Sequence, residues 1–294
     1  MKIVDAHHHI WDPGVNPHPW LSGPSIPFRY GDYAAIRSVF LWTEYDRVAM
    51  GWDVVASVTM EGEWDPADPV GEARWMQGLA ATEGRPAAHV AQAWLDAPDA
   101  DAVLEANAAC PIVRAVRHKP RANAAPGGPV GGMAEPAFIT GFRRLAAHGL
   151  HFELQTPWWH LDEAIELAKT ADTPIVLNHT GLPADRSADG QRSWRAAMAR
   201  LAQVPQIRVK ISGLGLAGGG WDPVSNRDVI RTTIDLFGPD RCMFASNFPV
   251  DRLCAGFDTI WREFDLATRD LTEAERASLF HATAIETYSL EADI

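Results

Sequence analysis

The chain is poor in cysteine and has no long apolar run. Among its 294 residues are three cysteines, Cys110, Cys242 and Cys254, too few and too irregularly spaced for a disulfide framework or a zinc ribbon. No apolar run approaches the roughly 20 residues that a membrane helix needs, so we expect no membrane partner. The opening Met1–Asp5 places an acid where a signal peptide has its apolar segment, which favours a cytoplasmic protein.

Basic residues are also scarce. The chain has 26 Lys and Arg against 38 Asp and Glu, a formal net charge of -12. Such a chain has no overall field that attracts a phosphate backbone, so we expect a small-molecule substrate and no nucleic-acid partner. Hydrophobic residues make up 47% and charged residues 22%, which is typical of a globular protein and excludes collagen-like or disordered chains. The composition leaves the oligomeric state open.

Short apolar runs with helical stretches between them indicate the fold class. We expect strands at Lys2–His7, Trp52–Thr59, Ala88–Trp94, Ile112–Arg117, Leu150–Gln155, Pro174–His179, Ile207–Ser212 and Arg241–Ala245. Runs of this kind fit strands that are covered on both faces, and about eight are needed for a closed parallel barrel. The sequence therefore predicts an α/β fold, a (β/α)8 TIM barrel, with residues 1–294 in a single domain.

The segments between the strands carry helix and loop signals. Leu161–Ala171 has one apolar stripe at helical spacing. Asp222 and Pro223 are a suitable cap and first-turn residue for a helix that runs to Phe237. Trp11–Tyr33 is rich in proline, glycine and tryptophan and has no period, so we expect it to cover one end of the fold.

Histidines follow the first and sixth expected strands. His7 and His9 should point the same way and His8 the opposite way, because side chains alternate along a strand. Two imidazoles at the C-terminal end of a barrel strand can share a metal or bind one substrate oxygen. His179 shares a face with Ile175 and Leu177, so it is a candidate to join them, with a structural role as the alternative.

Other strand ends offer polar groups for a substrate. The basic run Arg114–Arg121 indicates a site for an anion or a substrate oxygen, and Arg117 and His118, nearest the strand end, are its best candidates. The alternative is that the run is a solvated loop without a ligand. Asn247 ends the last strand and cannot act as a base, whereas Asp251 is either that base or a helix cap.

The fifth and seventh strands supply groups that face the barrel. Glu153 and Lys210 have the parity for a buried pair, and Gln155, nearest the end of its strand, is a candidate to orient substrate. Trp158, in the loop that follows, either stacks on a sugar-like ring or packs as part of a lid.

Taken together, these motifs resemble the amidohydrolase-related proteins, in the lactonase branch of the amidohydrolase superfamily. The resemblance covers nearly the whole chain and rests on Asp5-Ala6-His7-His8-His9-Ile10-Trp11-Asp12-Pro13, Arg117-His118, Phe152–Gln155, Val176–His179, Phe237–Arg241 and Ser246–Val250. It implies a distorted TIM barrel that hydrolyses a lactone, typically of a sugar acid or a carboxylated pyrone. It also implies that His7, His9 and His179 act at the site.

The resemblance also has implications for metal binding and for the general base that activates the water. Some relatives bind a divalent metal, such as zinc, with histidines like His7, His9 and His179, and members of this branch can work without one. Arg117 and His118 replace the carbamylated lysine of two-metal members, so we do not expect two metals. The family's strand-eight aspartate is Asn247 here, which leaves Asp251 or a histidine to activate the water.

The hypothesis for function is therefore lactone hydrolysis at the barrel mouth. Arg117, His118, Gln155 and Trp158 would bind the substrate, and the three histidines would polarise its carbonyl. Two alternatives stay open: a metal-dependent decarboxylase of aromatic or unsaturated acids on the same scaffold, and a sugar-acid lactone binding protein without catalysis.

Overall fold

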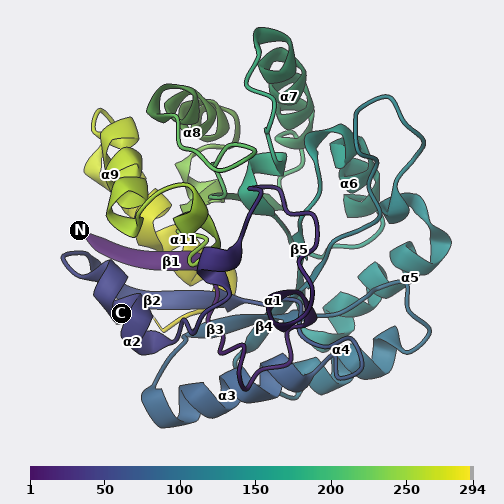
Figure 1. Cartoon of the computed structure of the whole chain (residues 1–294). Coiled ribbons are helices and arrows are strands. Elements are labelled where there is room, and N and C mark those ends of the chain that lie inside the picture. Colours follow the sequence, from purple (N-terminus) through teal and green to yellow (C-terminus); the bar gives the residue numbers. More distant parts are fainter. Residues whose placement is uncertain (292–294) are drawn as a thin grey trace.

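Eight parallel strands follow one another in a single sheet, in the order of the sequence (Figure 1). The computed structural model describes residues 1–291. The strands are β1 (Lys2–His8), β2 (Asp53–Met60), β3 (Ala88–Gln92), β4 (Val113–His118), β5 (His151–Leu154), β6 (Ile175–Leu177), β7 (Ile207–Ile211) and β8 (Cys242–Phe244). All eight expected strands are present, and the sheet curls into a nearly closed barrel, which confirms the predicted TIM barrel.

Helices alternate with the strands and surround the barrel (Figure 1). They are α1 (Pro19–Ser22), α2 (Trp42–Ala49), α3 (Gly71–Glu83), α4 (Ala100–Ala108), α5 (Pro136–Arg144), α6 (Leu161–Ala168), α7 (Ala188–Leu201), α8 (Pro223–Phe237), α9 (Phe257–Thr268), α10 (Glu273–Ala277) and α11 (Thr283–Tyr288). The start of α8 follows the predicted chemistry, because the Asp222 side chain accepts a hydrogen bond from the Val224 N–H. No helix within residues 1–291 is both long and apolar enough to cross a membrane.

Two apolar layers hold the barrel together. The larger fills the space between strands and helices, and includes Phe152 of β5 and Trp194 of α7. A smaller cluster fills the barrel interior, with Val58, Val176 and Met243 pointing inward from their strands. Inner and outer residues alternate along each strand as the pleat requires. The polar groups above the inner cluster therefore stand on rigid strands.

The barrel has a seam where β8 meets β1. In the described part of the chain these two edge strands form no ladder, whereas every other neighbouring pair does. Two backbone bonds bridge the seam at the C-terminal end: the Asn247 N–H donates to the His7 carbonyl at 2.8 Å, and the His9 N–H donates to the Phe248 carbonyl at 2.7 Å. Buried Asp5 adds a side-chain bridge, because it accepts from the backbone N–H and hydroxyl of Ser246.

The long segment after β1 lies across one end of the barrel, as expected, and contains α1 (Figure 1). The rings of Trp20 and Phe28 stack in it with 5.7 Å between centroids. The Trp20 indole N–H donates to the Gly62 carbonyl at 2.7 Å, which ties the segment to the loop after β2. The C-terminal mouth of the barrel thus has an aromatic cover.

Candidate active site

An irregularity in β1 determines which way its histidines point. Between Asp5 and His8 the pairing with β2 shifts by one residue, and such a bulge re-aims the side chains that follow it. His7 and His9 then point the same way, with 5.3 Å between ring centroids, while His8 packs on Tyr45 of α2 at 4.4 Å. The predicted split between the three histidines is correct.

The His179 ring lies beside His7, as predicted, but strand parity is not the reason. The strand ends at Leu177, whose side chain belongs to the outer layer, so strand parity does not aim His179 inward. Instead His179 has φ 54°, a left-handed conformation that non-glycine residues rarely adopt. Its ring lies 4.6 Å from that of His7. At Gly213, with φ 62°, an added Cβ would approach His179 Nδ1 to 2.6 Å, so only glycine leaves the ring room.

All three imidazoles are neutral at ordinary pH. Burial lowers the pKa of His7, His9 and His179 well below 6.5, and nearby cations such as Arg117 lower it further. His9 Nδ1 lies 2.9 Å from the Met60 carbonyl, and His179 Nδ1 lies 2.9 Å from Ser212 Oγ. Both ring nitrogens of buried His7 lack a hydrogen-bond partner. In His9 and His179, Nε2 is therefore the nitrogen left for a ligand.

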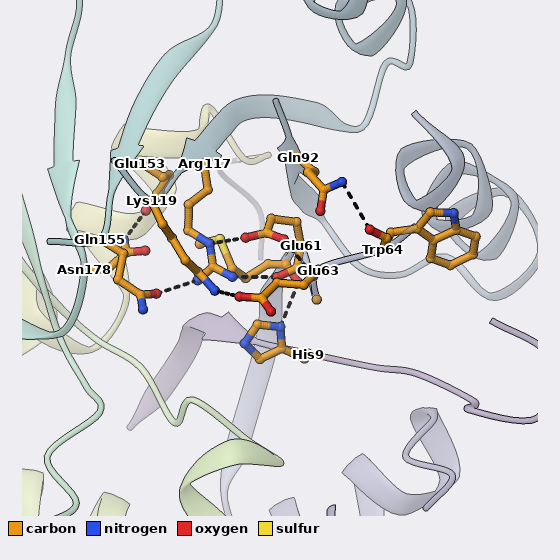
Figure 2. Close-up of polar contacts among 12 residues, drawn as sticks. His9, Glu61, Glu63, Trp64, Gln92, Arg117, Lys119, Glu153, Gln155 and Asn178 are labelled. Atoms are coloured by element: carbon orange, nitrogen blue, oxygen red, sulfur yellow. Dashed lines mark hydrogen bonds and ion pairs between the residues drawn. The ribbon is translucent and has the colours of Figure 1, made fainter. Parts of the chain in front are cut away.

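Arg117 is held by a carboxylate that the sequence analysis did not single out. Glu61 directly follows β2 and accepts from Arg117 Nε at 2.5 Å, while Arg117 Nη2 donates to the Glu61 carbonyl (Figure 2). Burial opposes the charge on Glu61, but Arg117 and then Lys119 outweigh it and lower the pKa of Glu61 to about 2. Arg117 Nη1 also donates to Gln155 Oε1 at 3.1 Å. In the sequence, only its position directly after a strand end could have identified Glu61 as a candidate site residue.

Asp251 lies behind Asn247. Asn247 has φ 51°, and its Nδ2 donates to Asp251 Oδ1 at 2.7 Å. The Tyr30 hydroxyl donates to the same oxygen at 2.9 Å, and Arg29 is 3.8 Å away. Asp251 is 1% exposed, and burial raises its pKa. The carboxylate therefore fixes Asn247, and it does not line the cavity described next.

A cavity of about 190 Å³ opens at the C-terminal ends of the strands. Its polar lining consists of His9, Arg29, Glu63, Arg117, Lys119, Gln155, His179 and Asn247. Trp20 and Phe28 form the aromatic side. A neutral, partly apolar ring with a polarisable carbonyl suits this lining, because imidazole and guanidinium groups meet it on one side and aromatic rings on the other.

The predicted pair of Glu153 and Lys210 lies inside the barrel. Lys210 Nζ is 3.0 Å from Glu153 Oε1, and both side chains are fully buried. Asn178 and Tyr288 also donate to Glu153. Burial opposes both charges. It lowers the pKa of Lys210 to about 8. At Glu153 the attraction of the Lys210 charge outweighs burial, so the pKa of Glu153 falls to about 2. The Lys210 charge also lowers the pKa of His7.

Two predicted substrate contacts lie away from this cavity. His118 accepts a hydrogen bond from the Leu95 N–H at 3.1 Å and stacks on Phe138, so it faces a neighbouring cavity. Trp158 packs against the core beside Gly181 and Trp159. The indole at the cavity is Trp20, from the aperiodic segment after β1.

The three histidines share some features of a metal site. Neutral imidazoles whose Nδ1 is anchored have the donor chemistry that zinc takes. However, within residues 1–291 no three His, Cys, Asp or Glu side chains are placed so that they could hold one ion. The Asp251 carboxylate is already bound by Asn247 and Tyr30, and that of Glu61 by Arg117. In this arrangement the residues do not fit a metal.

Comparison with known proteins adds the following. A family model described as amidohydrolase matches residues 4–290. A protein of Sinorhizobium fredii, y4mH, itself uncharacterised, is 37% identical over 98% of both chains. An L-fucono-1,5-lactonase of Burkholderia multivorans is 28% identical and covers 98% of this chain and 96% of its own. The crystal structure of an amidohydrolase from Burkholderia multivorans with bound zinc is 25% identical, covers 99% of this chain and 100% of its own, and has a TM-score of 0.80.

Proposed function

The chain belongs to the amidohydrolase family, and from this premise we propose that it is a hydrolase that opens the ester bond of a lactone, with sugar-acid lactones as the substrate class. One observation carries the proposal: neutral His9 and His179 meet at a small cavity together with Arg117 and an indole. The likeness to an L-fucono-1,5-lactonase over nearly the whole chain supports it. A sugar lactone offers an apolar ring face to Trp20 and hydroxyl groups to Gln155 and Asn247.

His9 is the general base of this proposal. The Met60 carbonyl can only accept a hydrogen bond, so the proton of neutral His9 is on Nδ1. Nε2 then carries the lone pair and takes a proton from the attacking water. The water oxygen bonds to the lactone carbonyl carbon, the ring C–O bond breaks, and His9 returns the proton to the leaving alkoxide. The product is the open hydroxy acid.

His179 stabilises the charge that develops on the carbonyl oxygen. Ser212 Oγ can donate to His179 Nδ1, which leaves the proton on Nε2 as a donor toward the oxyanion. Arg117, fixed by Glu61, adds positive potential beside it. Asn247 holds a substrate oxygen, and Asp251 acts as a positioning residue through Asn247. No step in this scheme needs a metal.

The test is a pH-indicator screen of purified protein against sugar-acid and dicarboxylate lactones, with His9→Gln beside the wild type. We expect acid release by the wild type and a loss of about 100-fold or more in kcat for His9→Gln, the size of a general-base contribution. His148→Gln, at a partly exposed position that does not line the cavity, is the control and should leave the rate unchanged. Release of carbon dioxide from aromatic acids, without any acid release from lactones, would contradict the proposal in favour of a decarboxylase.

A further inference from the structure

A second cavity lies beside the candidate active site. It has a volume of about 280 Å³ and is lined by Trp64, Gln92, Trp94 and His118, among others. Trp20, Glu63, Arg117 and Lys119 line both cavities. The two spaces are therefore neighbours along one wall.

Two of these four shared residues, Lys119 and Glu63, form an ion pair between exposed side chains. Lys119 contacts Glu63, and Figure 2 shows this pair between Gln155 on one side and Gln92 and Trp64 on the other, with His9 below it. The Lys119 side chain is 36% exposed and that of Glu63 48%. Exposed ion pairs of this kind contribute little to stability, because water competes for both charges. The pair can part or exchange its hydrogen bonds with a ligand at small cost.

The volumes indicate one site with two compartments. Neither about 190 Å³ nor about 280 Å³ reaches the lower end, about 300 Å³, of ordinary ligand pockets, but the two together do. A substrate that fills both would place its reacting carbonyl near His9 and a second part of itself beside Gln92, Trp94 and His118.

The lining of the second compartment suits a hydroxylated ring. Indoles offer flat apolar faces to the C–H groups of a sugar. His118 Nδ1 accepts from the Leu95 N–H, so in neutral His118 the proton is on Nε2. Nε2 lies 3.8 Å from the half-exposed Asp96 carboxylate, beyond hydrogen-bond distance, and can donate to a hydroxyl. Gln92 Nε2 donates to the Trp64 carbonyl, so its Oε1 is the atom that can accept from a sugar hydroxyl. An aryl group would cover the Trp94 indole but offer no hydrogen-bond donor to Gln92 Oε1, whereas a sugar hydroxyl does.

We propose that the compartment lined by Trp64, Trp94, Gln92 and His118 binds a glycosyl unit, so that the substrate is the lactone of a disaccharide acid. This inference rests on the proposed lactone hydrolysis and names its substrate class. The lactone ring occupies the compartment of His9 and the glycosyl ring lies on Trp94.

The first experiment compares kcat/KM for cellobiono-1,5-lactone and lactobiono-1,5-lactone with kcat/KM for glucono-1,5-lactone. We expect the wild type to prefer a disaccharide lactone, and Trp94→Ala to lower its kcat/KM about tenfold while the glucono-1,5-lactone value stays the same. Trp159→Ala removes an indole from a different cavity and should change neither value. Equal losses on both kinds of lactone in Trp94→Ala, or a preference for glucono-1,5-lactone or a phenyl-substituted valerolactone, would overturn the inference.

A binding measurement separates this inference from the proposed function. Isothermal titration calorimetry with cellobionate, lactobionate and gluconate, the open acids, requires no turnover. Tighter binding of a disaccharide acid that Trp94→Ala weakens, in a protein that opens no lactone, would sustain the glycosyl compartment and refute the hydrolase. If neither disaccharide acid binds more tightly than gluconate, the compartment is refuted whatever the hydrolysis screen gives.

Discussion

Replacing Lys210 by methionine should destabilise the protein strongly. The change leaves the fully buried Glu153 carboxylate without the ammonium group that lies 3.0 Å away. Removing one partner of a buried ion pair costs about 3–5 kcal/mol, because the other charge stays desolvated. For a chain of this size, that corresponds to a fall in Tm of roughly 6–20 °C. Thermal and urea unfolding at pH 7 measure both quantities.

The double variant Lys210→Met with Glu153→Gln is the matched control. It removes both charges, and replacing a buried ion pair by neutral groups of similar size is often close to neutral for stability. We therefore expect the double variant to recover most of the stability lost in Lys210→Met. If Lys210→Met folds with unchanged stability and unchanged activity, the reasoning about the pair is wrong.

Four further outcomes follow from the site. Asp251→Asn should keep kcat within about tenfold of the wild type with the same pH profile, since the loss of a general base would cost about 100-fold or more; a larger loss with an altered profile would return Asp251 to the base role. Wild-type kcat/KM should hold as pH falls through 6.5, because burial keeps His9 neutral there, and a loss of activity centred near 6.5 would contradict this. Treatment with a chelator followed by dialysis should leave activity unchanged, and activity that is lost and then restored by zinc would refute the scheme without a metal. Burial raises the pKa of Asp5 from 3.8 to about 6, so stability present below pH 4 should fall by about 3 kcal/mol as pH rises through 6; urea unfolding of Asp5→Asn should lack this step, and an identical pH dependence in the variant would assign it to other groups.

The direction of side chains on the strands could be predicted from the sequence, because successive side chains on a strand point to opposite faces. The alternation of side chains between the two faces of a strand predicted the parity of Glu153 and Lys210, and the structure confirms their pairing. The same alternation separated His8 from His7 and His9, and the shift in β1 preserves that split. Where a strand continues, the side-chain direction follows from counting.

The rest of the site could not be predicted by counting. His179 enters the mouth through a left-handed turn, which no periodicity indicates. Trp20 reaches the cavity from a segment without a period, and the sequence analysis favoured Trp158, which packs against the core. Glu61 follows a strand end, but only its contact with Arg117, 56 residues away in sequence, gives it a role. The positions of His179, Trp20 and Glu61 depend on loop geometry and on contacts between distant segments, which a local sequence pattern does not encode.

The seam between β8 and β1 determines when the active site can exist during synthesis. Asp5 and Ser246 are separated by 241 positions, and the backbone bonds that join His7 to Asn247 and His9 to Phe248 cross the same junction. A ribosome-bound chain that still lacks β8 holds His7 and His9 without their backbone bonds to Asn247 and Phe248. The candidate active site is therefore complete only when the last strand docks, and the onset of the proposed activity during translation would report the closure of the whole barrel.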